Sequence, residues 1–275
     1  MTIEQFVQKQ IKYQTIRRIA VIVAVLSPLG FFAGIWWLSI LIVVLIIACI
    51  GVYMNLQERY TQLALSFKKD HLKQAIESRY PNVRFDMNKG FLPIDVYGSK
   101  LIERGDIFKS EDMLQGKIGT TRFRTADVKI QFERLGRNGR QIITRFSGKY
   151  YEIELPFIIN KPVYIVNNGA EKFGIKLGLP RVDFEYIDFN NEVDVYASDT
   201  EAAFKLLKPK AMESILKLRQ KYGSVAFAFF NKTMVVAMEG RNSFEFYIHR
   251  KIDKHFLETI EQEIQTLIDL STSVK

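Results

Sequence analysis

The side chains that most often carry catalysis are few in this chain, and their spacing does not favour chemistry. The three histidines are His71, His249 and His255, and the last two are six residues apart, which is not a same-face spacing on a helix. The only cysteine, Cys49, lies in a long uncharged stretch, away from an aqueous substrate. No Gly-x-Ser-x-Gly or Gly-Lys-Ser/Thr motif occurs. The sequence therefore predicts no catalytic residue, no cofactor and no metal site.

An acidic run between Asp183 and Asp194 is the next candidate for chemistry. Its members occupy two predicted strands and are Asp183, Glu185, Asp188, Glu192 and Asp194. Solvated strand faces account for such a run, and carboxylates without a pocket or a partner do not make an active site. Alternatively, the run complements a basic surface, within one molecule or between two. If the protein is an enzyme, this is one of the first places to look.

Basic residues are concentrated between Arg122 and Lys149. The net charge of the chain is +9, and within this stretch eight basic residues are opposed only by Asp127 and Glu133. The eight are Arg122, Arg124, Lys129, Arg134, Arg137, Arg140, Arg145 and Lys149. They form a solvated strand surface, a site for anionic lipid at about 1 kcal/mol per residue, or a site for an acidic protein partner. No nucleic-acid-binding motif accompanies them, so nucleic acid is not an expected partner.

The alternation of residue types predicts that these basic residues lie on an antiparallel hairpin. Strands are expected at Ala126–Phe132 and from Ile142 to Leu155, where apolar and charged residues alternate. The Asn138-Gly139 pair between them is a strong signal for a tight turn. Outward positions of the hairpin would then carry the charge.

A stretch of thirty-nine residues without a charged side chain or histidine, Ile19–Gln57, gives the chain its location. One helix of that length would measure about 58 Å, whereas the hydrocarbon core of a bilayer is about 30 Å thick. Two short spans with a turn near Phe31–Trp37 fit better than a single tilted span. Basic residues flank both ends, which places both termini in the cytoplasm. A Gly-x-x-x-Gly at Gly30 and Gly34 could associate helices, but the oligomeric state stays open.

We expect four regions in an α+β protein that begins with a transmembrane helical hairpin. Residues 1–18 form either an amphipathic helix at the cytoplasmic interface or the start of the first span, with a Thr2–Gln5 capping box. Residues 19–55 hold two transmembrane helices at about 19–32 and 37–55. A membrane-proximal helix follows at 56–81, ended by Pro81. Residues 82–275 form a cytoplasmic domain with a mainly antiparallel sheet and flanking helices.

Further elements are expected within this domain. A short helix is predicted at Ser99–Phe108, a capping box at Ser198 and Glu201, a helix with Pro209 in its first turn, and an amphipathic helix at the C-terminus. A central buried hairpin is predicted from two fully apolar runs around Asn231-Lys232-Thr233. The other predicted strands are Lys117–Thr121, Lys161–Val166, Phe184–Asp188, Glu192–Ala197 and Phe244–Ile248.

The order of several short motifs resembles that of a bacterial membrane protein family of unknown function. The motifs are Ser110-Glu111-Asp112-Met113-Leu114-Gln115-Gly116-Lys117, then Phe146-Ser147-Gly148, then the Asp199–Pro209 segment with its paired leucines. The resemblance implies an inner-membrane protein in which a membrane hairpin is followed by a cytoplasmic α+β domain. It implies no activity, cofactor or catalytic residue, and the basic tip at Arg137–Arg140 departs from it.

The sequence thus favours a membrane-anchored, non-enzymatic docking module. Its partners would be the lipid bilayer and either anionic lipid or an acidic protein. The alternative is a membrane-associated enzyme whose site is assembled from residues distant in the sequence.

Overall fold

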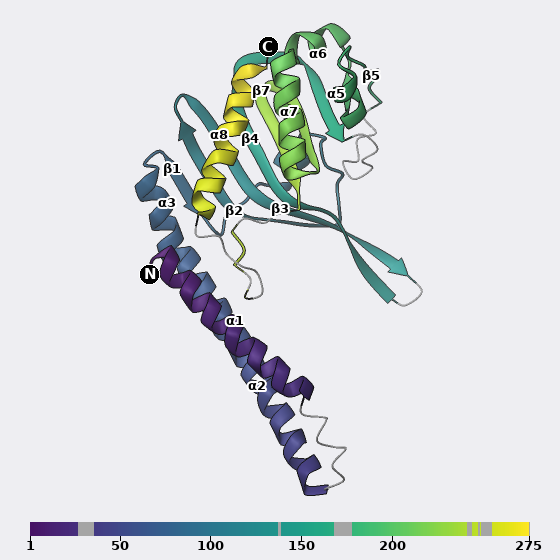
Figure 1. Cartoon of the computed structure of the whole chain (residues 1–275). Helices are drawn as coiled ribbons and strands as arrows, with labels where there is room; N and C mark the ends of the chain where they lie inside the picture. Colours follow the sequence, from purple (N-terminus) through teal and green to yellow (C-terminus); the bar gives the residue numbers. More distant parts are fainter. Residues whose placement is uncertain are drawn as a thin grey trace. The chain divides into compact units, whose positions relative to one another are not determined.

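The computed structural model describes residues 1–26, 36–136, 139–167, 178–240, 244–246, 248 and 255–274. These residues form two compact units: one combines Met1–Ala75 with Phe244–Leu257, and the other combines Ile76–Ser243 with Glu258–Lys275. The first unit is helical and the second carries the sheet (Figure 1). The predicted α+β class, with a mainly antiparallel sheet and flanking helices, is confirmed.

The first unit is built on two long helices. Helix α1 spans Ile3–Leu26, and α2 spans Trp36–Ser66 and continues through a π-helical segment, η2 (Phe67–Leu72), into α3 (Lys73–Arg79). The predicted capping box is confirmed, since the Thr2 backbone N–H donates to Gln5 Oε1 at 3.0 Å and the Gln5 N–H to Thr2 Oγ1 at 3.2 Å. The turn expected near residues 31–37 lies mostly outside the described residues.

Helices α1 and α2 pack side by side in opposite directions. Residues early in α1 contact residues late in α2, through Phe6 stacked on Phe67 (ring centroids 4.2 Å apart), Tyr13 against Tyr60 (5.9 Å), and Arg17 donating to the Tyr53 hydroxyl (2.9 Å). Residues 3–18 are therefore the first part of one continuous helix that packs along α2.

The sheet of the second unit has seven strands in its described residues, and all paired strands run antiparallel. The path is β1-β2-β3-β4-β6-β5, and β7 pairs with β4. The strands are β1 (Val83–Asp86), β2 (Ile107–Ile118), β3 (Thr121–Gly136), β4 (Gly139–Asn167), β5 (Arg181–Val182), β6 (Val193–Ala197) and β7 (Val225–Glu239). The predicted strand Lys161–Val166 is the last part of β4.

Strand β4 is the centre of this sheet. Along one edge it pairs with β7, from Gly148 opposite Glu239 to Ile165 opposite Phe227. Along the other edge its first half pairs with β3 and its last residues, from Val163, pair with β6. Residues 148–153 and 163–165 of β4 are therefore paired on both sides.

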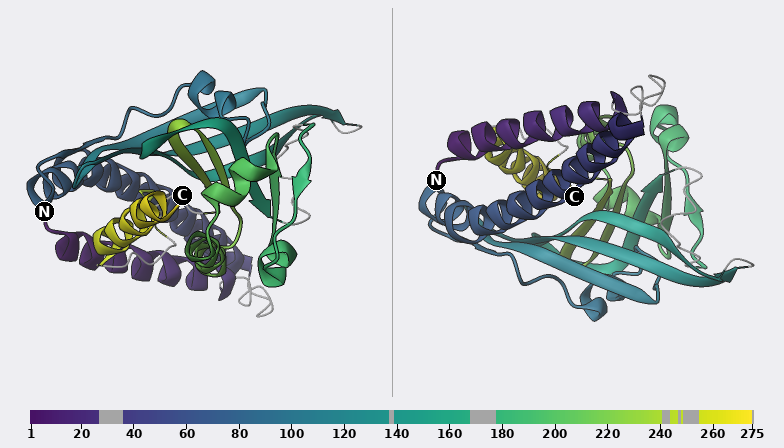
Figure 2. Two further views of the ribbon diagram at one scale, coloured as in Figure 1. Left: turned by 90° about the horizontal axis from the view of Figure 1, so that it is seen from above. Right: turned by 90° about the horizontal axis from the view of Figure 1, so that it is seen from below.

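Helices cover the sheet on both faces. Figure 2 shows α7 (Pro209–Tyr222) and α8 (Phe256–Ser273) over one face. The other face packs against the segment around α4 (Pro93–Gly98), in a core that includes Phe91, Val96, Leu101, Ala126, Val128, Ile130, Tyr150, Val235 and Ala237. Two short helices, α5 (Ile187–Glu192) and α6 (Thr200–Leu206), complete the domain.

The predicted central hairpin around Asn231 is wrong, because β7 is one long strand. Its pairing with β4 keeps one direction on both sides of Asn231, so the chain bends there instead of reversing. Asn231 has a φ of 52°, a left-handed conformation that asparagine tolerates better than most residues. A polar triplet between two apolar runs therefore marks a bend in this strand.

Four other local predictions also differ from the structure. Phe184–Asp188 is not a strand, because the Asn190 side chain exchanges hydrogen bonds with the Phe184 backbone and α5 begins at Ile187. The short helix expected at Ser99–Phe108 lies earlier in the chain, at Pro93–Gly98 (α4). The Lys117–Thr121 stretch joins β2 to β3 through a turn at Gly119. Of Phe244–Ile248, the described residues 244–246 and 248 are not in a strand.

The helix after Ser198 begins one residue later than predicted. Asp199, and not Ser198, is the capping residue, since its carboxylate accepts from the Ala202 N–H at 3.2 Å. The prediction for Pro209 is confirmed: it occupies the first turn of α7, where a missing N–H costs nothing.

Candidate membrane and partner surfaces

An apolar surface runs along both helices of the first unit. On α2 most of the exposed aliphatic side chains lie between Ile40 and Met54, and on α1 most lie between Ile19 and Val25; Ile11, Ile16 and Leu65 are exposed outside these stretches. Because the helices run antiparallel with Arg17 beside Tyr53, the two stretches lie at the same level. Within the described part of the chain, one helix is long and apolar enough to cross a membrane, at Ile40–Arg79.

The Arg17–Tyr53 pair marks one border of this apolar surface. The guanidinium lies 4.9 Å from the centre of the Tyr53 ring and donates to its hydroxyl. Tyrosine and arginine side chains of this kind favour the boundary between hydrocarbon and water. From Trp36 to Tyr53 the helix measures about 26 Å, close to the ~30 Å of a hydrocarbon core.

The eight basic residues of the predicted patch do not form one free surface. Five of them pair with carboxylates: Arg122 with Glu154 (3.9 Å), Arg124 with Glu152 (2.9 Å from Nε), Arg140 with Glu133 (2.6 Å), Arg145 with Glu103 (3.2 Å) and Lys149 with Glu263 (2.5 Å). Lys129 and Arg134 are exposed, and Arg137 lies outside the described residues. Binding of a membrane or a partner by these residues stays a prediction.

Lys149 is the clearest departure from a surface role, because it is buried. Its ammonium pairs with Glu263 of α8, and the Tyr151 hydroxyl donates to the same carboxylate. Asp127, also buried, lies directly opposite Lys149 on β3. This group of charges fastens α8 to the sheet, and its burial was not predictable from the alternation of residues along β4.

The ends of β3 and β4 form a two-stranded ribbon, termed here the β3–β4 tip (residues 132–136 and 139–144). The pairing of β2 with β3 ends at Gln131 and that of β7 with β4 ends at Gly148, so no third described strand pairs with the tip. Figure 1 shows it extending past the other strands of the second unit. Leu135 is 88% exposed, Ile142 57% and Ile143 44%. Sequence reasoning noted the charges of this hairpin and missed its exposed aliphatic residues.

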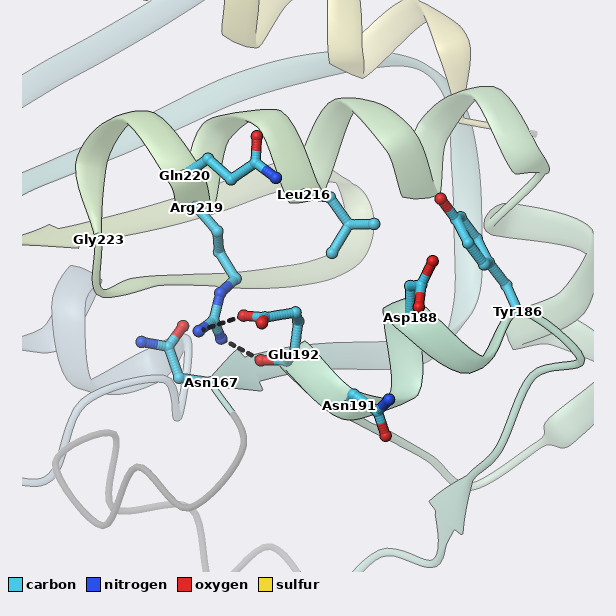
Figure 3. A pocket seen from close by; sticks show the side chains of 9 residues that line it. All are labelled: Asn167, Tyr186, Asp188, Asn191, Glu192, Leu216, Arg219, Gln220 and Gly223. Atoms are coloured by element: carbon cyan, nitrogen blue, oxygen red, sulfur yellow. Dashed lines mark hydrogen bonds and ion pairs between the residues drawn. The ribbon is translucent and has the colours of Figure 1, made fainter.

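The acidic run is divided between a pocket and an ion pair. Asp183 and Asp194 both pair with Arg181, each at 3.2 Å. Asp188 and Glu192 instead line an open pocket of about 480 Å³ beside α7 (Figure 3). There the Arg219 guanidinium pairs with the Glu192 carboxylate at 2.9 Å, while Asp188 and Tyr186 lie at the other end.

The pocket has the chemistry of a polar binding groove. Its lining offers amides, one tyrosine hydroxyl and two carboxylates, one of which is already neutralised by Arg219. None of the lining residues is a serine, cysteine or histidine. No group of three or more metal-ligating side chains occurs within the described ranges. A small polar molecule could bind here, but these residues do not make a nucleophile–base pair.

The motifs that resemble a known family have structural roles here. The Ser110 hydroxyl accepts from the Phe91 N–H and donates to the Asp127 carbonyl, both at 2.9 Å. A side chain on Gly116 would lie 2.3 Å from the Asn82 carbonyl oxygen, and one on Gly148 would lie 2.0 Å from that of Met238. These glycines let neighbouring strands approach closely.

Fold and surfaces together describe an α+β domain joined to a long apolar helix. The family described as "Protein of unknown function (DUF3137)" matches residues 144–275, from within β4 to the C-terminus, which is just under half of the chain. No curated protein matches the sequence.

One solved structure is similar, the crystal structure of the mycobacterial trehalose monomycolate transport factor A, TtfA. The identity is 10%, the match covers 74% of this chain and 95% of that one, and the TM-score is 0.43. A likeness at this level supports no inference about function.

Proposed function

We propose that both helices of the first unit span a membrane and that the α+β domain works at its cytoplasmic face as a non-enzymatic docking module. The observation that supports this most is the apolar surface shared by α1 and α2, with exposed aliphatic residues at the same level on both. Exposing this apolar surface to water would cost a free energy of roughly 25 cal/mol per Å². In a bilayer it faces hydrocarbon and costs nothing.

The borders of the surface support two spans. The Arg17–Tyr53 pair lies at one end, and in the sequence Trp36 and Trp37 precede the apolar residues of α2. Basic residues lie in α1 before position 19 and again after position 58 in α2. This distribution favours a cytoplasmic location for both termini.

Reporter fusions test this topology. Alkaline phosphatase, which is active only outside the cytoplasm, is expected to be active when fused after Gly34 in the predicted turn and inactive when fused after Lys275. Green fluorescent protein should give the opposite pattern. Phosphatase activity at Lys275 would contradict the proposal.

The docking role is supported by how the charged side chains are used. Carboxylates of the acidic run pair with Arg181 and Arg219, whereas the β3–β4 tip leaves Leu135 and Arg134 exposed. A photocrosslinking amino acid at Leu135 in intact membranes should form specific adducts with the docking partner. The same group at Ile187, exposed elsewhere on the domain, should not. Equal labelling from both positions would count against docking.

A further inference from the structure

We propose that the β3–β4 tip inserts between the headgroups of an anionic bilayer. The proposal rests on the proposed function, because the membrane anchor is what keeps the domain close to a bilayer. It deepens that function by assigning the docking partner: lipid, bound through exposed aliphatic side chains and arginines of one ribbon.

Register places the exposed aliphatic residues on both faces of the tip. Residues directly opposite in an antiparallel pair share a face, and neighbours along a strand alternate. Leu135 lies opposite Arg140 and Ile142 opposite Glu133, which puts Leu135 and Ile142 on one face. Ile143, opposite Phe132, lies on the other face. No other described strand pairs along this ribbon, and the aliphatic side chains on both of its faces are exposed.

This arrangement favours lipid over a protein partner. A protein groove covers one face or one edge of a ribbon and would leave the aliphatic residues of the other face in water. Headgroups and acyl chains surround an inserted element on all sides. The tip also has a suitable length, since from Gly139 to Ile143 it measures roughly 13 Å, compared with the ~5–10 Å to which interfacial elements enter a bilayer.

The charge of the tip complements an anionic surface. The described residues of the tip include two arginines and one glutamate. Arg134 is exposed, and Arg140 pairs with Glu133 on the face that carries Leu135. Arginine stems can follow aliphatic neighbours into the interface while the guanidinium stays at the phosphates. Attraction of this kind weakens as salt increases.

A fluorescent probe on the full-length chain tests the insertion. With Cys49→Ala as background, an environment-sensitive probe is attached at Leu135→Cys or, as a matched exposed control on α5, at Ile187→Cys. The protein is reconstituted into vesicles of phosphatidylcholine, with or without phosphatidylglycerol, and quenched with doxyl-labelled lipid. We expect a blue shift and several-fold stronger quenching at position 135 than at 187 in the anionic vesicles, decreasing with added salt.

Two outcomes separate this inference from the proposed function. If the chain resists alkaline extraction and the probe at 135 remains as water-exposed as that at 187, the anchor stands and insertion of the tip is refuted. If alkali extracts the chain from the vesicles, both proposals fail.

Charge reversal tests the specificity of the contact. Arg134→Glu with Arg140→Glu should abolish the shift of the probe at 135 in anionic vesicles. The matched control is Lys210→Glu with Lys217→Glu, which makes the same change in charge at exposed positions of α7. It should leave the shift intact. An equal loss in both double variants would mean that the whole domain is drawn to the surface without a specific role for the tip, which overturns the proposal.

Discussion

Gly148 has no room for a side chain, because the backbone of β7 lies where its Cβ would be. A Cβ there would lie 2.0 Å from the Met238 carbonyl oxygen and 2.9 Å from its carbon. We therefore expect Gly148→Ala to lower the free energy of unfolding by roughly 1–3 kcal/mol or more. Gly98→Ala, where nothing lies within 4 Å, is the control, and thermal unfolding of the purified full-length chain is the measurement. Equal stability of the two variants would refute the close approach.

The buried Lys149–Glu263 pair is expected to contribute more to stability than an exposed ion pair does. Both side chains are less than a tenth exposed, so Glu263→Gln removes the carboxylate that is paired with a buried ammonium. Loss of one partner of a buried pair typically costs about 3–5 kcal/mol. Glu154→Gln, which breaks a solvent-exposed pair with Arg122, should cost about 1 kcal/mol or less. Denaturant titration distinguishes the two, and similar costs would argue against the burial of Lys149.

Glu152 is expected to make the stability of the folded protein depend on pH. Burial raises its pKa above the ordinary value, although Arg124 beside it acts in the opposite direction. A folded-state pKa above the unfolded one means that the folded protein binds the proton more tightly, so stability falls as pH rises through the unfolded value and up to the folded one. Glu152→Gln avoids that fall. The variant should match the wild type at low pH and exceed it in stability near neutral pH, as measured by melting temperature; lower stability of the variant at neutral pH would contradict this.

Among the elements, those defined by local signals were predicted well and those defined by distant contacts were not. The Thr2 capping box, Pro209 in α7 and the C-terminal helix each depend on residues a few positions apart. By contrast, β7 is one strand because β4 pairs with it on both sides of Asn231, although the register shifts at that point. The burial of Lys149 likewise depends on α8, more than a hundred residues away.

The packing of α1 on α2 is expected to stabilise the first turns of α1. Phe6 is fully buried and stacks on Phe67 at the start of the π-helical segment. Phe6→Ala should remove about 3–5 kcal/mol of packing and loosen the first turns of α1. Hydrogen exchange of residues 3–18 in detergent or lipid is the measurement, and Ile11→Ala, at an exposed position, is the control. Unchanged exchange in the Phe6 variant would refute the packing.

For the whole molecule, the sequence predicted the fold class and the location of the apolar segment, because composition and periodicity carry both. It did not predict which of the basic residues would be free. The alternation along β3 and β4 places Arg124 and Lys149 outward, but Glu152 and Glu263 reach them in the folded domain. The exposed aliphatic residues of the tip were missed because an alternating strand gives no sign of where the neighbouring strands end.

The central claim for the whole molecule is that α1 and α2 both face lipid. It is tested most directly by spin labels at Val25→Cys on α1 and Ile47→Cys on α2, in the Cys49→Ala background of the full-length protein in vesicles. The two native side chains are 68% and 64% exposed, so they form a matched pair. Two spans predict that both labels are accessible to oxygen and protected from a water-soluble nickel relaxation agent. Protection at Ile47 together with free access of the nickel agent to Val25 would show a single span and contradict the claim.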